Sequence, residues 1–150
     1  MSYGYSGNHG ASAPSMFEKL QNAYEWAPVP LRVSLAALFA FTGIMKVMNV
    51  DGVTQYFTGL GFPAAQAFVW LAIILEVGGA VCLLLGLWTR ITAMLLSALL
   101  VIAIITGYLI PWDASKLPLL MNHWPMLGAT LALVFSGPGK WSLDEKFFWE

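Results

Sequence analysis

The sequence predicts an all-α protein, an integral membrane four-helix bundle with a short N-terminal amphipathic helix. Hydrophobic residues make up 59% of the 150 residues and charged residues only 10%, a composition too apolar for a water-soluble domain of this size. Four apolar runs of about 20 residues each can cross a hydrocarbon layer that is about 30 Å thick. Proline, glycine and charged residues separate these runs and mark the connections between helices.

Net charge and cysteine content exclude several classes of function. The formal net charge is −1, so the chain offers no basic surface to nucleic acid. The single cysteine, Cys82, excludes an intramolecular disulfide and a paired-cysteine redox motif. His123 has no closely spaced set of metal ligands around it in the sequence, and we therefore expect no metal site.

Four segments differ in composition. Residues 1–15 are rich in glycine, serine and tyrosine and bury little apolar area, which predicts a flexible tail. In residues 16–30, apolar side chains recur on one helical face, as in an amphipathic segment that lies on the membrane surface. Residues 31–136 hold the four transmembrane helices. Residues 137–150 begin with Gly-Pro-Gly and form a polar and aromatic C-terminal tail.

The first predicted span covers residues 31–50. Arg32 and Lys46 lie near its two ends, where their long side chains can reach the membrane surface. Asp51-Gly52 breaks this span. The segment that follows, residues 53–63, has apolar residues at positions i, i+3, i+4 and i+7, which predicts one or two interfacial helical turns.

The second span covers residues 64–87 and the third covers residues 91–110. Only three residues separate them, so the two helices should be antiparallel neighbours. The fourth span covers residues 119–136. Pro125 and two polar residues lie in its first turns, and we expect this beginning to be bent or irregular.

Four spans place both termini on one side of the membrane, and basic residues favour that side by five to two. The two sets are Lys19, Arg32, Arg90, Lys140 and Lys146 on the side of the termini, and Lys46 and Lys116 on the other. Because lysine and arginine are enriched in cytoplasmic loops, we expect a multi-pass protein of the plasma membrane with both termini in the cytoplasm.

Glu76 lies near the middle of the second span. A charged residue at a helix centre costs about 2.5–3.5 kcal/mol on insertion scales, so Glu76 should face protein or water, or be protonated. Small residues share its helix face and indicate that it points into the bundle. Its partner stays open, as does the choice between a structural anchor and a proton-handling or ligand-contacting acid. The candidate partners are Lys46, Arg90, Arg32, Ser97, Thr106 and a backbone carbonyl.

A second group of polar and aromatic residues lies toward the outer end of the bundle: Tyr108, Trp112, Asn122 and His123. Such residues suit a quinone, because a histidine or tyrosine can donate a hydrogen bond to a quinone carbonyl while the tail stays in lipid. An aromatic belt at the membrane interface is the alternative, since tyrosine and tryptophan gather there in any membrane protein.

Five short motifs follow one another along most of the chain. They are Gly43-Ile44-x-Lys46, Phe57 with Gly61-x-Pro63, Glu76 with Gly78-Gly79, Gly86-x-x-Thr89-Arg90, and Gly137-Pro138-Gly139-x-x-Ser142-Leu143-Asp144. Together they resemble the DoxX family of small four-helix membrane proteins over residues 31–144. The resemblance implies a four-helix bundle and an association with membrane redox assemblies, as in a subunit of an archaeal thiosulfate:quinone oxidoreductase.

Three functions are compatible with these features. The first is an accessory or structural subunit of a larger redox complex, respiratory or oxygenase-like, in which Glu76, Lys46 and Arg90 hold the bundle together. The second is a quinone-linked oxidoreductase subunit, with the quinone near His123 and Tyr108. The third is a small transporter or channel. A non-catalytic subunit is favoured, the expected partners are the bilayer and other membrane subunits, and the only cofactor expected is a non-covalent quinone.

Overall fold

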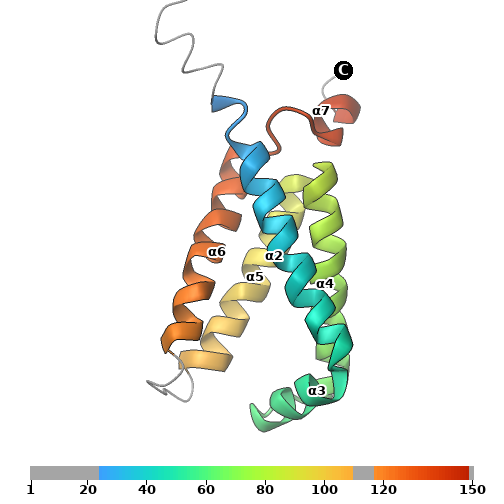
Figure 1. The fold of residues 1–150 in the computed structure, drawn as a ribbon, viewed down its shortest axis with the longest axis vertical. Helices are drawn as coiled ribbons and strands as arrows, with labels where there is room; N and C mark the ends of the chain where they lie inside the picture. The colour runs from blue at the N-terminus through green and yellow to red at the C-terminus, as the bar shows by residue number, and fades with distance from the viewer. Residues whose placement is uncertain (1–23, 110–116, 149–150) are drawn as a thin grey trace, which may run out of the picture.

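Four long helices run side by side in the computed structural model, which describes residues 24–109 and 117–148. They are α2 (Pro28–Met48), α4 (Ala65–Leu85), α5 (Thr89–Ile104) and α6 (Leu117–Ser136), as Figure 1 shows. Over the described residues the chain is helical and contains no strand. The predicted all-α class is confirmed, whereas most of the predicted amphipathic segment, residues 16–23, lies outside the described residues.

The long helices close into a ring around an apolar core. Helix α2 contacts α4 and α6, and α5 contacts the same two helices from the other side. The core between them is built from large apolar side chains that are almost fully buried: Leu35, Phe39, Leu83, Leu96, Leu100 and Leu133. This ring is the bundle that the four apolar runs predict.

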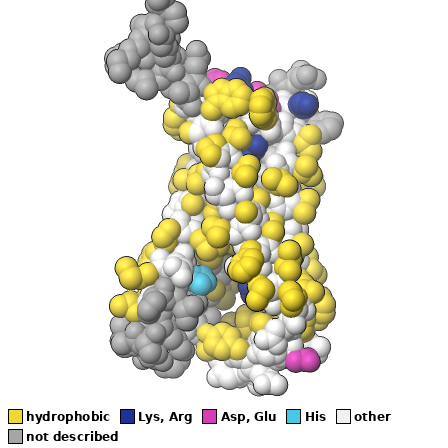
Figure 2. Space-filling view, viewed as in Figure 1, with side chains coloured by type: hydrophobic (Ala, Val, Ile, Leu, Met, Phe, Trp, Pro, Cys, Tyr) yellow, Lys and Arg dark blue, Asp and Glu magenta, His cyan; other side chains and the backbone are white. Residues whose placement is uncertain are grey.

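The outer surface of the bundle is apolar at its middle. Phe41 and Ile74, near the middle of α2 and α4, are each more than 60% exposed. Figure 2 shows hydrophobic side chains over the centre of the visible face, with most of the charged side chains toward its two ends. Three described stretches are long and apolar enough to cross a membrane: Pro28–Met48, Ala65–Leu85 and Thr89–Gly107. Since large exposed apolar surfaces require an apolar surrounding, the protein is a multi-pass membrane protein.

The first span ends earlier than predicted. The chain turns at Asn49, which has φ −139° and ψ 51°, and the predicted break at Asp51-Gly52 is wrong because both residues belong to α3 (Val50–Gly59). The Asn49 side chain accepts a hydrogen bond from the Gly52 N–H at 3.2 Å and thereby caps α3. The predicted interfacial turns are thus a ten-residue helix, which lies across one end of the bundle (Figure 1).

The third and fourth spans also differ in detail from the prediction. Helix α5 ends at Ile104 and continues as a π-helical segment, η1 (Ile105–Leu109), a geometry often found at functional sites. Helix α6 is helical from Leu117 onward and contains Pro125. Its beginning is thus regular helix, and the alternative of a bend stays a prediction. The residues between η1 and α6 lie outside the described part of the chain.

The C-terminal tail is partly folded, which the sequence reading missed. Helix α7 (Leu143–Phe148) starts with a capping box, in which the Ser142 hydroxyl oxygen accepts a hydrogen bond from the Glu145 N–H at 3.1 Å. Asp144 caps a second helix, because its carboxylate accepts hydrogen bonds from the N–H groups of Trp88 and Thr89 at 2.6 and 2.8 Å. Helix α5 has no side-chain cap of its own, so α7 supplies it.

Asp144→Ala is expected to lower the free energy of unfolding by about 1–2 kcal/mol, because it leaves two N–H groups at the beginning of α5 without an acceptor. Chemical unfolding in detergent measures this loss. Asp51→Ala is the matched control, since Asp51 also lies in a first helical turn but is exposed. Equal losses in the two variants would contradict the capping role.

Candidate functional site

Glu76 forms an ion pair with Lys46 inside the bundle. Lys46 Nζ lies 2.8 Å from Oε1 and 2.7 Å from Oε2 of Glu76, and the Thr42 hydroxyl lies 3.1 Å from Oε2. Glu76 is 7% exposed, while the Lys46 side chain keeps 25% of its surface exposed. The predicted orientation of Glu76 into the bundle is therefore observed, and of the open candidate partners it is Lys46 that binds it.

The other candidate partners of Glu76 are engaged elsewhere. The Ser97 hydroxyl bonds to the Ala93 carbonyl and to the Thr130 hydroxyl, both at 2.8 Å, and the Thr106 hydroxyl donates to the Ile102 carbonyl at 2.7 Å. The hydroxyl groups of α5 and η1 thus bond to backbone carbonyls of α5 and, through Thr130, to α6. The charged pair is a contact between α2 and α4.

Close packing of α2 on α4 explains why Lys46 reaches the acid. A Cβ atom built on Gly43 would lie 3.3 Å from the Glu76 Cβ and 2.7 Å from a Val77 methyl group, so only glycine fits at this crossing. Gly43 is level with Glu76, and Lys46 lies one helical turn further along the same face. One turn spans about 5 Å, a distance that a lysine side chain covers easily.

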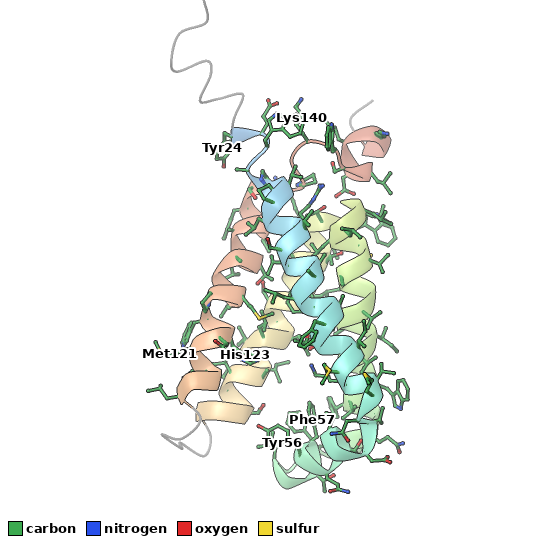
Figure 3. All side chains as sticks on the ribbon, viewed as in Figure 1. Tyr24, Tyr56, Phe57, Met121, His123 and Lys140 are labelled. Atoms are coloured by element: carbon green, nitrogen blue, oxygen red, sulfur yellow. The ribbon has the colours of Figure 1, made fainter. Side chains whose placement is uncertain are left out.

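The ion pair lines a cavity of about 280 Å³ near the α3 end of the bundle. Side chains from α2, α3, α4, α5 and α6 surround it, together with the π-helical segment. Its polar residues are Lys46, Tyr56, Glu76, Thr106 and His123, and its apolar wall includes Val53, Phe57, Leu60, Ala72, Leu99, Leu100 and Ala103. Figure 3 shows Tyr56 and Phe57 on α3 and His123 on α6 in the same half of the molecule.

Only part of the predicted quinone group lines this cavity. His123 does, whereas Asn122 is exposed and is not part of the wall. The side chain of Tyr108 and all of Trp112 lie outside the described residues. Tyr56 is the tyrosine that lines the cavity. Its hydroxyl lies beside Gly107, where a Cβ atom built on this glycine would approach it to 3.2 Å. The sequence contains a signal for Tyr56, because it precedes Phe57 in the segment of residues 53–63, which follows the first span at the same outer end.

Arg90 lies far from the ion pair, at the opposite end of the bundle. It is exposed, and its guanidinium packs against Gly137 at the end of α6. Arg32, which we expected to reach the membrane surface, is instead 2% exposed. Its guanidinium donates hydrogen bonds to the carbonyls of Pro138 at 2.6 Å and Trp141 at 3.1 Å, because the C-terminal segment folds over the beginning of α2.

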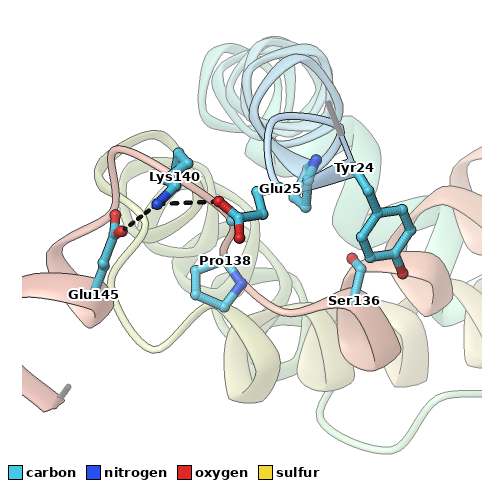
Figure 4. Close-up of a pocket in the computed structure, with 8 residues that line it drawn as sticks. Tyr24, Glu25, Ser136, Pro138, Lys140 and Glu145 are labelled. Carbon is cyan, nitrogen blue, oxygen red and sulfur yellow. Dashed lines mark ion pairs between the residues drawn. The ribbon is translucent and has the colours of Figure 1, made fainter. Parts of the chain in front are cut away.

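A second polar cavity, of about 260 Å³, lies at that same end (Figure 4). Lys140 lies between two carboxylates there, 3.1 Å from Glu25 and 3.6 Å from Glu145. The hydrogen bond and the charge of Glu25, with the charge of Glu145, raise the pKa of Lys140 above its ordinary value. The side chains of Lys140 and Glu25 are 41% and 54% exposed, whereas Glu76 is 7% exposed. The more enclosed cavity at the α3 end is therefore the better candidate for a ligand.

The fold and the cavity define a multi-pass helical membrane protein with a charged pair enclosed in its bundle. A family model described as DoxX matches residues 27–109, and the chain belongs to the DoxX family. The resemblance seen in the sequence motifs is thereby confirmed. No solved structure matches the chain.

Three relatives show how widely the family is spread. The chain is 31% identical to the inner membrane protein YphA of Escherichia coli, over 77% of the chain and 86% of the relative. It is 31% identical to an uncharacterised membrane protein of Mycobacterium tuberculosis, over 91% of both chains. It is 34% identical to a Bacillus subtilis protein named "Putative oxidoreductase CatD", over 58% of the chain and 63% of the relative.

Proposed function

We propose that the protein is a quinone-binding membrane subunit of a larger redox complex. The observation that carries this proposal is the cavity at the α3 end, where a charged pair, a tyrosine and a histidine converge between apolar walls. Its volume of about 280 Å³ is close to the lower limit of about 300 Å³ for small-molecule sites. The redox assignment is supported by the name of the relative CatD.

The polar residues of the cavity fit a quinone headgroup, whose two carbonyl oxygens accept hydrogen bonds. Lys46 has three N–H donors, and the carboxylate of Glu76 occupies two of them. The third donor, the Tyr56 hydroxyl and the His123 ring are the groups that would bind the carbonyls. Quinone reduction consumes protons, and the ring of a histidine and a buried carboxylate are side chains that exchange protons.

The exposed apolar surface and the distribution of charge support a location among lipids and other subunits, and an orientation in the membrane. Broad apolar faces such as that around Phe41 and Ile74 suit lipid and neighbouring membrane subunits alike. Arg32, Arg90 and Lys140 share the end that carries α7, whereas Lys46 lies toward the other end. By the positive-inside rule the α7 end faces the cytoplasm, in the plasma membrane.

Quinone binding to the purified protein in lipid nanodiscs tests this function. A short-tailed benzoquinone is expected to bind, and His123→Leu is expected to weaken binding about tenfold, because one hydrogen bond to the ligand is worth about 1–1.5 kcal/mol. Asn122→Leu is the matched control, since the neighbouring residue is exposed and lies outside the cavity wall. Tyr56→Phe should weaken binding to a similar extent as His123→Leu.

Two outcomes would contradict the proposal. If the quinone partitions equally into protein-containing and empty nanodiscs, the cavity binds none, and the role of a purely structural subunit would explain the protein better. If Asn122→Leu weakens binding as much as His123→Leu, the effect comes from the stability of α6 and not from the cavity. Ion flux through liposomes that contain only this protein would favour a channel instead.

A further inference from the structure

A further cavity, of about 270 Å³, adjoins the polar cavity at the α3 end and is almost wholly apolar. It lies between α4 and α5 and is bounded near α3 by aromatic rings. Leu71, Leu95 and Ile102 form its outer edge, and each is about half exposed. Because these residues lie on the lipid-facing surface, this groove is open to the bilayer and not to water.

The groove and the polar cavity share part of their walls. Phe57, Ala72, Leu99, Ala103 and Thr106 line both. Two of these five residues are alanines, on facing helices, so that little side-chain volume separates the two spaces. The groove therefore adjoins the polar cavity on its lipid-facing side.

A row of aromatic rings follows the same path. Ring centroids are 6.2 Å apart for Tyr56 and Phe57, 5.1 Å for Phe57 and Phe62, and 5.3 Å for Phe62 and Phe68. The first ring of the row lies at the polar cavity, and the last lies at the lipid-facing groove. Edge and tilted contacts of this kind hold neighbouring rings in fixed orientations. The end of α3, the turn after it and the beginning of α4 therefore provide a continuous aromatic wall from one space to the other.

We infer that this groove holds the isoprenoid tail of the quinone, so that the ligand is a lipid-soluble quinone that enters from the bilayer between α4 and α5. This inference rests on the proposed function. An amphiphile with a polar ring and a long apolar chain matches a polar chamber joined to an apolar groove. The acyl chain of a phospholipid would also suit the groove, but the negatively charged phosphate of the lipid does not match the adjoining chamber, where Glu76 already neutralises Lys46.

Photolabelling in nanodiscs tests the inference with two quinone analogues. The ring probe has a diazirine on the quinone ring, and the tail probe has a diazirine on the first isoprene unit. The ring probe is expected to label residues of the polar cavity. The tail probe is expected to label the segment around Leu95 and Ile102, and excess quinone without a diazirine should suppress both. Labelling is located by mass spectrometry of peptides.

Ala98→Phe places a ring in the volume that we assign to the tail and is expected to reduce tail labelling at least about fivefold. Ala37→Phe is its control, because Ala37 lines a different lipid-facing groove between α2 and α4. Ring labelling in the cavity without tail labelling at α5 would overturn this inference and leave the proposed function intact. The absence of competed labelling with either probe would overturn both, and tail labelling that quinone does not suppress would assign the groove to lipid.

Discussion

Lys46→Met is expected to lower the free energy of unfolding by about 3 kcal/mol, because it leaves the Glu76 carboxylate buried without a counter-ion. Removing one partner of a buried ion pair costs about 3–5 kcal/mol. The lower value applies here because the Lys46 side chain is 25% exposed, so part of its charge is already solvated. The Thr42 hydroxyl alone would then bind the acid.

Substitutions of Lys46 and of Glu76 should lower the free energy of unfolding by unequal amounts. Glu76→Gln is expected to cost less than Lys46→Met, since the lysine left behind can extend toward the membrane surface. The double variant Lys46→Met with Glu76→Gln should be more stable than Lys46→Met alone, because no charge then remains buried. This non-additivity is the signature of a direct interaction.

Reversible unfolding of all four proteins in mixed detergent micelles measures the coupling. Lys140→Met is the matched control, since it also removes a lysine that is paired with acids, but at an exposed position. Its unfolding midpoint is expected to stay close to that of the unchanged protein. Additive effects of the Lys46 and Glu76 substitutions would show that the pair does not stabilise the bundle.

The sequence predicts the helices well because each apolar run matches the thickness of a membrane. It does not predict which side chains meet across them. Glu76 and Lys46 are the example: Glu76 lies near the middle of its predicted span and Lys46 near the end of another, which implies a gap between them across the membrane. The gap disappears in the structure because Gly43 lets α2 cross α4 at the level of Glu76, and the position of that crossing depends on packing between helices.

The C-terminal segment contains a sequence motif for the start of a helix that the predictions did not use. Ser142-x-x-Glu145 is a capping box, and it starts α7 as such a motif predicts. What no local pattern could show is the partner of Asp144, because the N–H groups of Trp88 and Thr89 lie more than fifty residues away in the chain. The same long-range folding buries Arg32, which local reasoning placed at the membrane surface.

Arg32→Leu is expected to lower the free energy of unfolding by about 3 kcal/mol, because it removes both hydrogen-bond donors that hold the C-terminal segment on α2. The carbonyls of Pro138 and Trp141 would lose their partners, and each hydrogen bond to a charged group contributes about 1.5–3 kcal/mol. Arg32→Lys should recover only part of the loss, since an ammonium lacks the planar fork that reaches two carbonyls at once.

The Arg32→Leu substitution should also change the hydrogen bonds at the beginning of α5. Release of the C-terminal segment withdraws Asp144 from the N–H groups of Trp88 and Thr89, so hydrogen exchange at these two amides is expected to accelerate in Arg32→Leu. Arg90→Leu is the control, because it removes an exposed arginine at the same end of the bundle. If both variants accelerate exchange equally, general loss of positive charge is the cause. If only Arg32→Leu does, the buried guanidinium joins the C-terminal segment to α5.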